Sequence, residues 1–178
     1  MPIPKPGPVA AWFNRVPSYL YRAHLGAIMG PRFVMLTTVG RRSRAVRRTV
    51  VEVFARGETP GRDGLPVLHV VASRGARSDW YANATSMGRI RVDWMDRRGR
   101  ADVHRLDIDD RVHLLTRYAS DHPKAAAMLV KGVLDEPSTA GTEQMRRLAA
   151  AVRALRLEPA GGAITDGSTA DSDVAPRR

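Results

Sequence analysis

Short apolar runs rich in Val, Thr and Phe alternate with polar connections through the middle of this chain, which is typical of β-strands. Apolar residues at helical spacing occur on either side of that region. The pattern predicts strands at residues 32–39, 46–55, 65–73, 90–95, 101–108 and 153–159. It predicts helices at residues 9–27, at 80–86 after an Asp79 N-cap, from Asp109 or Asp110 to about 119, after His122-Pro123, and at 142–151.

The connections between the predicted strands are short, which favours antiparallel pairing. Residues 56–64 read as a turn-forming loop, and "DRRGR" at 96–100 reads as the turn of a hairpin. We therefore expect a mainly β fold with peripheral helices (α+β), built as a small antiparallel barrel. The expected organisation is an N-terminal helical segment at 1–30, the barrel at 31–159, and a disordered tail at 160–178 that lacks apolar periodicity.

Composition narrows the class of protein. With 178 residues and 43% hydrophobic residues, the chain is long enough for one domain with a real core. No stretch approaches the roughly 20 apolar residues of a membrane span, and the N-terminus lacks the apolar region of a signal peptide. We expect a cytoplasmic protein. The absence of cysteine excludes disulfides, thiol nucleophiles and thiolate metal sites.

The formal net charge of +11 indicates an anionic partner, such as a nucleic acid, an acidic membrane surface or a phosphorylated small molecule. No helix-turn-helix, zinc-finger or RNA-binding signature is present, so no nucleic acid is expected. Five arginines fall within residues 41–48, between two predicted strands. Clustered like charges repel one another unless something compensates them, and "GRRSRAVRR" therefore reads as an anion-binding loop.

A second candidate segment is "VVASRGARSDWYANA", where a strand ends and a glycine-containing loop leads into a capped helix. Free backbone N–H groups at such a junction can bind a planar heterocycle or its phosphate. Trp80 could stack on a ring or pack in the core, and the residues alone leave both open. The histidines lack metal-ligand spacing, and no nucleophile or acid–base set can be singled out, so neither a metal site nor a hydrolase is expected.

The chain resembles the deazaflavin-dependent nitroreductase family of actinobacteria over about residues 17–159. Three segments carry the resemblance, in this order: "LTTVGRRSRAVRRTVV", "VVASRGARSDWYAN" and the closing "LRLEP". The family pattern is Thr-Thr-x-Gly-Arg-Lys/Arg-Ser-Gly-x-x-Arg, then Ala-Ser-x-Gly, then Trp-Tyr-x-Asn. The resemblance implies a split β-barrel, similar to flavin-mononucleotide-binding barrels, that binds coenzyme F420, a deazaflavin carrying a phosphate and an acidic oligoglutamate tail. The barrel at 31–159 would then be the coenzyme-binding domain.

The resemblance also implies roles for individual residues. Reduced F420 delivers hydride from its own ring, so no catalytic side chain is expected. Arg41, Arg42, Ser43, Arg47 and Arg48 would contact the phosphate or tail, Thr49 and Val50 would lie along the coenzyme, Ala72, Ser73 and Arg74 would lie near the ring, and Trp80, Tyr81 and Asn83 would lie beside them.

Two positions depart from the family pattern. Arg44 replaces the glycine that usually follows the serine, and "HPKAAAML" at 122–129 lacks the tyrosines that often line the substrate pocket. The expected function is an F420-dependent oxidoreductase acting on a small organic acceptor of the quinone, nitro or enone class. Peripheral membrane association is expected if the acceptor is a quinone. The alternatives are an F420 carrier without turnover, a flavin mononucleotide (FMN) reductase, and a basic nucleic-acid or membrane-surface binder.

Overall fold

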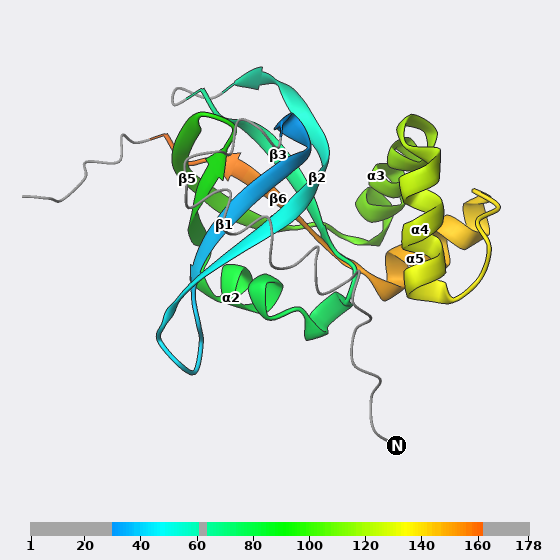
Figure 1. Ribbon diagram of the computed structural model, residues 1–178, viewed down its shortest axis with the longest axis horizontal. Coiled ribbons are helices and arrows are strands. Elements are labelled where there is room, and N and C mark those ends of the chain that lie inside the picture. Colours follow the sequence, from blue (N-terminus) through cyan, green and yellow to red (C-terminus); the bar gives the residue numbers. More distant parts are fainter. Residues whose placement is uncertain (1–29, 61–63, 162–178) are drawn as a thin grey trace, which may run out of the picture.

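The computed structural model describes residues 30–60 and 64–161, and in this part six strands close into a barrel. Every neighbouring pair in the barrel is antiparallel, in the order β1-β2-β3-β6-β5-β4. The strands are β1 (Phe33–Val39), β2 (Val46–Pro60), β3 (Pro66–Ala72), β4 (Arg89–Trp94), β5 (Arg97–Arg105) and β6 (Arg153–Pro159). The fold is therefore the antiparallel α+β barrel that the sequence predicts (Figure 1).

Alternation along the strands fills the barrel interior with aliphatic side chains. Val34 and Leu36 of β1, Ile90 and Val92 of β4, and Leu155 of β6 are at most 2% exposed and belong to one core cluster. The residues between them point outward, because successive side chains of a strand lie on opposite faces.

Helix α2 (Asp79–Met87) closes one end of the barrel, below it in Figure 1. Ser78 is its N-cap residue, and Gly88 ends it in the left-handed conformation at φ 69°. Its Tyr81 and Ala84 are buried in the barrel core, so the helix is fixed to the barrel by packing. This position places the outer side of α2 beside the loop that joins β1 to β2.

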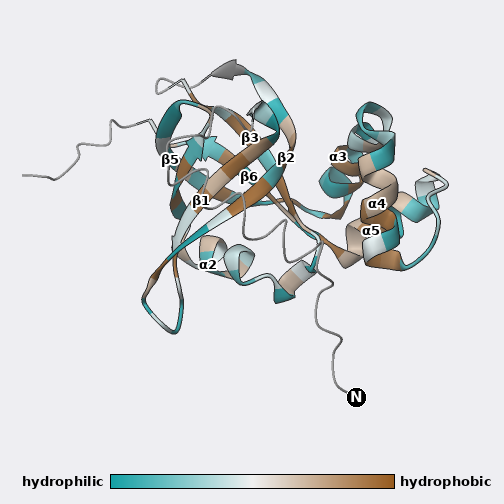
Figure 2. Ribbon diagram, in the orientation of Figure 1, coloured by the Kyte–Doolittle hydropathy of each residue, from teal (hydrophilic) through white to brown (hydrophobic). Residues whose placement is uncertain are grey.

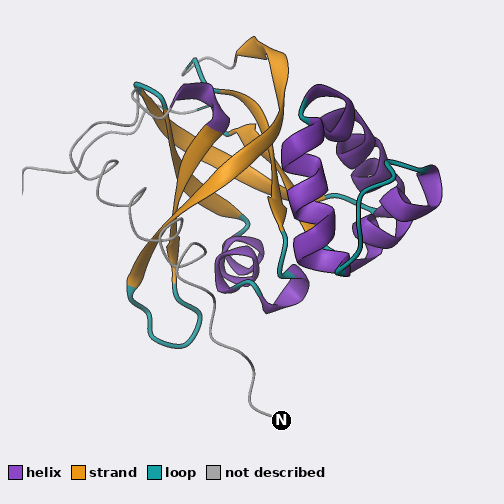
Figure 3. Cartoon of the chain, turned by 45° about the vertical axis from the view of Figure 1, so that its right-hand side comes forward, coloured by secondary structure: helices purple, strands orange, loops and turns teal. Residues whose placement is uncertain are grey.

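The helices α3 (Ile108–Asp121), α4 (Pro123–Leu134) and α5 (Thr142–Ala151) form a second layer on one side of the barrel (Figure 3). Their hydrophobic faces, brown in Figure 2, form a separate core cluster with outward residues of β3 and β6. Leu115, Val130 and Leu148 of these helices pack with Val71 and Ala154.

A polar contact joins the helical layer to the barrel at Tyr118, whose side chain is 2% exposed. The Tyr118 hydroxyl donates to Glu52 Oε1 over 2.5 Å, and Arg32 Nε donates to the same oxygen over 2.8 Å. Burial, with the Glu52 hydrogen bond in second place, raises the pKa of the Tyr118 phenol. Tyr118 also stacks on Phe54 at 4.1 Å between ring centroids.

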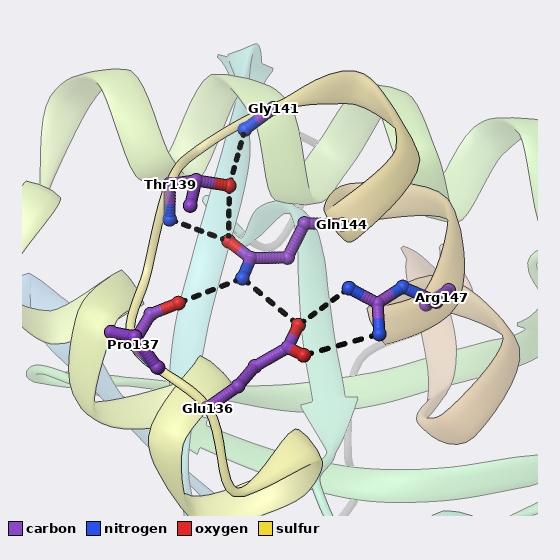
Figure 4. A network of polar contacts seen from close by, with 6 residues as sticks. All are labelled: Glu136, Pro137, Thr139, Gly141, Gln144 and Arg147. Carbon is purple, nitrogen blue, oxygen red and sulfur yellow. Dashed lines mark hydrogen bonds and ion pairs between the residues drawn. The ribbon is translucent and has the colours of Figure 1, made fainter.

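The connection between α4 and α5 is held by one buried amide (Figure 4). Gln144 Nε2 donates to Glu136 Oε1 and to the Pro137 carbonyl, each over 2.9 Å, and the Gln144 Oε1 accepts from the Thr139 backbone N–H over 2.8 Å. Arg147 then binds both carboxylate oxygens of Glu136, at 3.1 and 2.7 Å.

Several predicted elements agree with the structure, and several predicted boundaries are wrong. Strand β2 continues to Pro60 through the predicted loop, because that segment pairs with β3. The arginines predicted to lie in the hairpin turn belong to β5, where Arg97 pairs with Trp94. Asp107, and not Asp109 or Asp110, caps α3, because its carboxylate accepts the Asp110 N–H over 2.8 Å.

The predicted N-cap Asp79 is also wrong, because α2 begins at Asp79 itself and Ser78 is the N-cap residue. The predictions for β1, β3, β4, α5 and β6 agree within two residues at each end, and α4 begins at Pro123 as predicted. The strand predicted to reach residue 108 is wrong at that end, because β5 ends at Arg105 and α3 begins at Ile108. The predicted helix at 9–27 lies outside the described residues, as do residues 162–178 of the tail predicted at 160–178.

Candidate functional site

A pocket of about 430 Å³ lies between the β1–β2 loop and α2. It brings together residues from two segments that are about 40 positions apart in the sequence, as Arg41 and Asn83 are (|i−j| = 42). Its lining consists of Gly40, Arg41, Arg42, Ser43, Arg47, Arg48, Thr49, Asp79, Trp80 and Asn83. Eight of the predicted site residues are among them: Arg41, Arg42, Ser43, Arg47, Arg48, Thr49, Trp80 and Asn83.

The loop at residues 40–45, here called the arginine loop, is tightly closed. Gly40 N–H donates to the Ala45 carbonyl over 2.8 Å, and Arg44 N–H donates to the Gly40 carbonyl over 2.9 Å. A Cβ at position 40 would lie 2.5 Å from Ser43 Oγ, so a larger residue there would force the Ser43 hydroxyl to turn away. Arg44 adopts a positive φ of 55°, a conformation that costs an L-residue free energy and that glycine adopts freely.

Arg41 fastens the arginine loop to α2. Its backbone N–H and its Nη1 both donate to Asn83 Oδ1, over 3.3 and 3.1 Å. Its Nη2 lies 3.7 Å from Asp79 Oδ1. The Asn83 side chain is buried, and its oxygen accepts hydrogen bonds from Arg41 of the loop. Arg41 and Asn83 therefore position the pocket wall.

Arg42, Arg47 and Arg48 are exposed and form no ion pair with any carboxylate in residues 30–60 and 64–161. Asp79 is the acidic residue among those lining this pocket, and Arg41 lies against it. Guanidinium groups bind phosphate and carboxylate in a bidentate way. The donor set therefore fits a phosphorylated, carboxylate-bearing ligand.

Trp80 forms the apolar part of the pocket wall. It is partly buried and packs against the barrel core, while one side lines the pocket. Tyr81 meets it edge to face, with ring centroids 6.2 Å apart, but Tyr81 lies in the core and does not line the pocket. Both sequence readings of Trp80, as core and as ring-side residue, are compatible with this position.

The remaining predicted site residues do not line this pocket. Val50 points to the outer face of the barrel, where it pairs with Met35. Ala72 is buried in the core, and Ser73 and Arg74 are exposed on the segment that follows β3. That segment leads through a short 3-10 turn (Gly75–Arg77) into α2, and so ends beside the pocket.

Gly40 and Asp79 line the pocket although they were not predicted as site residues. The sequence holds a signal that could have identified Asp79, because it indicates that a helix starts there. When a helix starts at a pocket wall, the side chains of its first turn belong to that wall.

A larger pocket, of about 850 Å³, lies at the opposite end of the barrel, near the starts of β1 and β3. Its cations are Arg32, Arg56, Arg97 and Arg117, and its acids are Glu58, Asp96 and Asp121. Because carboxylates accompany the arginines there, the smaller pocket is the stronger anion site despite its size.

Within 30–60 and 64–161, no group of three His, Asp or Glu side chains could hold a metal ion. In the same part of the chain, no helix combines the length and the hydropathy of a membrane span.

Comparison with known proteins gives one family match. The family model described as F420H(2)-dependent quinone reductase matches residues 15–130. No curated protein matches the chain.

Among solved structures, the chain is similar to an F420-H2 dependent reductase (FDR-A), with 18% identity and a TM-score of 0.46, over 71% of this chain and 94% of that one. It is also similar to Atu2129, a protein of unknown function from Agrobacterium tumefaciens, with 18% identity and a TM-score of 0.46. That match covers 90% of this chain and 59% of the other.

Proposed function

This chain belongs to the F420H(2)-dependent quinone reductase family, and on that premise we propose that it is an F420-dependent oxidoreductase that reduces a small organic acceptor. The acceptor class named by the family is a quinone, with nitro compounds and enones as the other classes to test. The FMN alternative receives no support from the family match.

The observation that carries the proposal is the set of three exposed arginines, Arg42, Arg47 and Arg48, beside Trp80 in one pocket. A phosphate and several carboxylates on one ligand would balance this charge. In the proposed arrangement these arginines hold the phosphate and the start of the tail, and the hydroxyl groups of Ser43 and Thr49 add donors.

The deazaflavin, when bound, supplies the hydride. The chain's own residues bind, orient and shield. Trp80 offers a flat apolar surface for a ring. Ser73 and Arg74 do not line the pocket but lie on the segment that leads into α2 beside it. Positioning alone can lower the activation barrier of a reaction by about 7–11 kcal/mol in well-oriented model reactions.

A second candidate function is a carrier that holds F420 without turnover. The observation that favours it is α4 (Pro123–Leu134), which has no aromatic residue and whose Ala126 and Val130 are buried in the helical layer. The aromatic substrate wall expected from the resemblance is therefore not supplied by this helix.

Steady-state oxidation of reduced F420, followed by absorbance with a panel of quinones, nitroaromatics and enones, tests the proposal. We expect turnover that is fastest with quinones. Binding of the coenzyme without turnover on any acceptor would favour the carrier. Absence of F420 binding would contradict both.

A further inference from the structure

The outer face of the barrel carries a row of cations that starts at the pocket. In the strand register, Arg48 of β2 lies opposite Thr37 of β1, Thr37 lies opposite Arg91 of β4, and Arg91 lies opposite Arg100 of β5. Directly paired residues share one face of a sheet. The inward neighbours of Arg91, Ile90 and Val92, are in the core, so this row faces outward.

The rows on either side contain carboxylates. On one side the Nε and Nη2 of Arg89 donate to the two carboxylate oxygens of Asp102, over 2.7 and 3.1 Å. On the other side Asp93 lies 3.2 Å from Arg98. These two rows are thus largely neutral.

The row itself contains no carboxylate. Arg48 and Arg100 are exposed and form no ion pair with a described carboxylate, and Arg91 reaches only Asp93, at 3.6 Å, which it shares with Arg98. Arg91 and Arg100 are directly opposed like charges, an arrangement that destabilises a sheet. An anion lying along the row would relieve this repulsion.

The row is continuous with the pocket, because Arg48 belongs to both. At about 4.8 Å between neighbouring strands, the backbone of Arg91 lies about 10 Å from that of Arg48, and the backbone of Arg100 about 15 Å, measured along the sheet. An extended chain spans about 3.3–3.6 Å per residue, so four or five residues cover that distance.

We propose that Arg91 and Arg100 form an outer binding site for a polycarboxylate chain, and that its occupant is the distal part of the oligoglutamate tail of F420. The inference rests on the proposed function, since it extends the same ligand beyond the pocket. It makes binding depend on tail length: one glutamate reaches only the arginine loop and Arg48, whereas five or more reach Arg100.

The test compares dissociation constants for F420 with one glutamate and F420 with five or more, in the full chain and in the double variant Arg91→Gln/Arg100→Gln. For the wild type we expect the long-tailed form to bind about 2- to 30-fold more tightly, as two exposed ion pairs provide. In the double variant the ratio should fall to about 1, with the affinity for the one-glutamate form unchanged. The single variant Arg100→Gln should lose part of the ratio.

The matched control is Arg56→Gln/Arg105→Gln, which removes the same charge from two exposed arginines outside the row. An equal loss in this control, or a tail-length ratio that survives in the Arg91/Arg100 variant, would overturn the site. The site would also be overturned if the Arg91/Arg100 variant kept the tail-length ratio and lost a binding to phosphatidylserine vesicles that the wild type has. That result would assign the row to a lipid surface. If neither form of F420 binds the wild type, the proposed function falls and the outer site with it.

Discussion

Asn83 decides how the arginine loop is held. Its Oδ1 accepts two hydrogen bonds from Arg41, and its side chain is 6% exposed. Asn83→Ala would leave the Arg41 N–H without its partner, which costs about 1–2 kcal/mol of folding stability. We also expect weaker F420 binding, because the loop loses its attachment to α2.

The matched control for this prediction is Thr85→Ala, on the same helix, whose hydroxyl bonds only to carbonyls of α2, at Tyr81 and Ala82. Denaturant unfolding and coenzyme titration measure the two effects. Unchanged affinity in Asn83→Ala would show that the loop does not depend on this contact.

Arg44 has a backbone conformation that lowers the free energy of unfolding. Its φ of 55° is the left-handed conformation, in the position where the resembled family has glycine. Arg44→Gly should therefore raise the unfolding free energy by about 0.5–1 kcal/mol, since the strain removed exceeds the added chain entropy. Arg42→Gly, at a neighbouring loop position without a positive φ, should not stabilise. Equal effects of the two variants in urea unfolding would contradict the strain.

At the scale of elements, the α4–α5 connection has a pH dependence that can be worked out. Hydrogen bonds from Gln144 and then Arg147 lower the pKa of Glu136. Because the charged form is favoured in the folded state, this contribution is present above the ordinary value of 4.5 and is lost as the pH falls below it. Glu136→Gln should therefore destabilise the protein at pH 7 and have less effect at pH 3.5.

Thermal unfolding at the two pH values measures this difference. The control is Glu143→Gln, an exposed position in the first turn of α5. If the Glu136→Gln penalty were the same at both pH values, the carboxylate would not be the group that carries it.

The elements also show what the sequence can and cannot predict. Helix α5 and strand β6 follow from local apolar periodicity, and their predicted limits are confirmed. The extension of β2 to Pro60 could not be predicted from composition, because "RGETP" has turn-forming residues and is held as strand by pairing with β3. Tertiary pairing outweighs local propensity there.

At the scale of the whole molecule, which has a net charge of +11, arginines cluster partly because they are close in the sequence and partly because the fold brings distant ones together. The charge of the arginine loop could be predicted, since five arginines lie close together in the sequence at residues 41–48. The row of Arg48, Arg91 and Arg100 could not, because these residues become neighbours only through the register of four strands.

This concentration predicts a salt dependence. Between 0.1 M and 1 M salt the Debye length falls from about 10 Å to about 3 Å, so exposed arginines attract a distant anion less. We expect the dissociation constant of F420 to rise over this range. The deazaflavin nucleoside without phosphate and tail should bind with nearly constant affinity, and equal salt dependence of both ligands would contradict an arginine-held tail.

The most direct measurement is a tryptophan-fluorescence titration of the full chain with F420 and, in parallel, with FMN. Trp80 lines the pocket, whereas Trp94 lies inside the barrel at 6% exposure and serves as the internal reference. We expect saturable quenching by F420, little effect of FMN at the same concentrations, and loss of most of the quenching in a folded Trp80→Phe variant. Equally tight saturation by FMN, or quenching that persists in Trp80→Phe, would contradict the assignment of this pocket to F420.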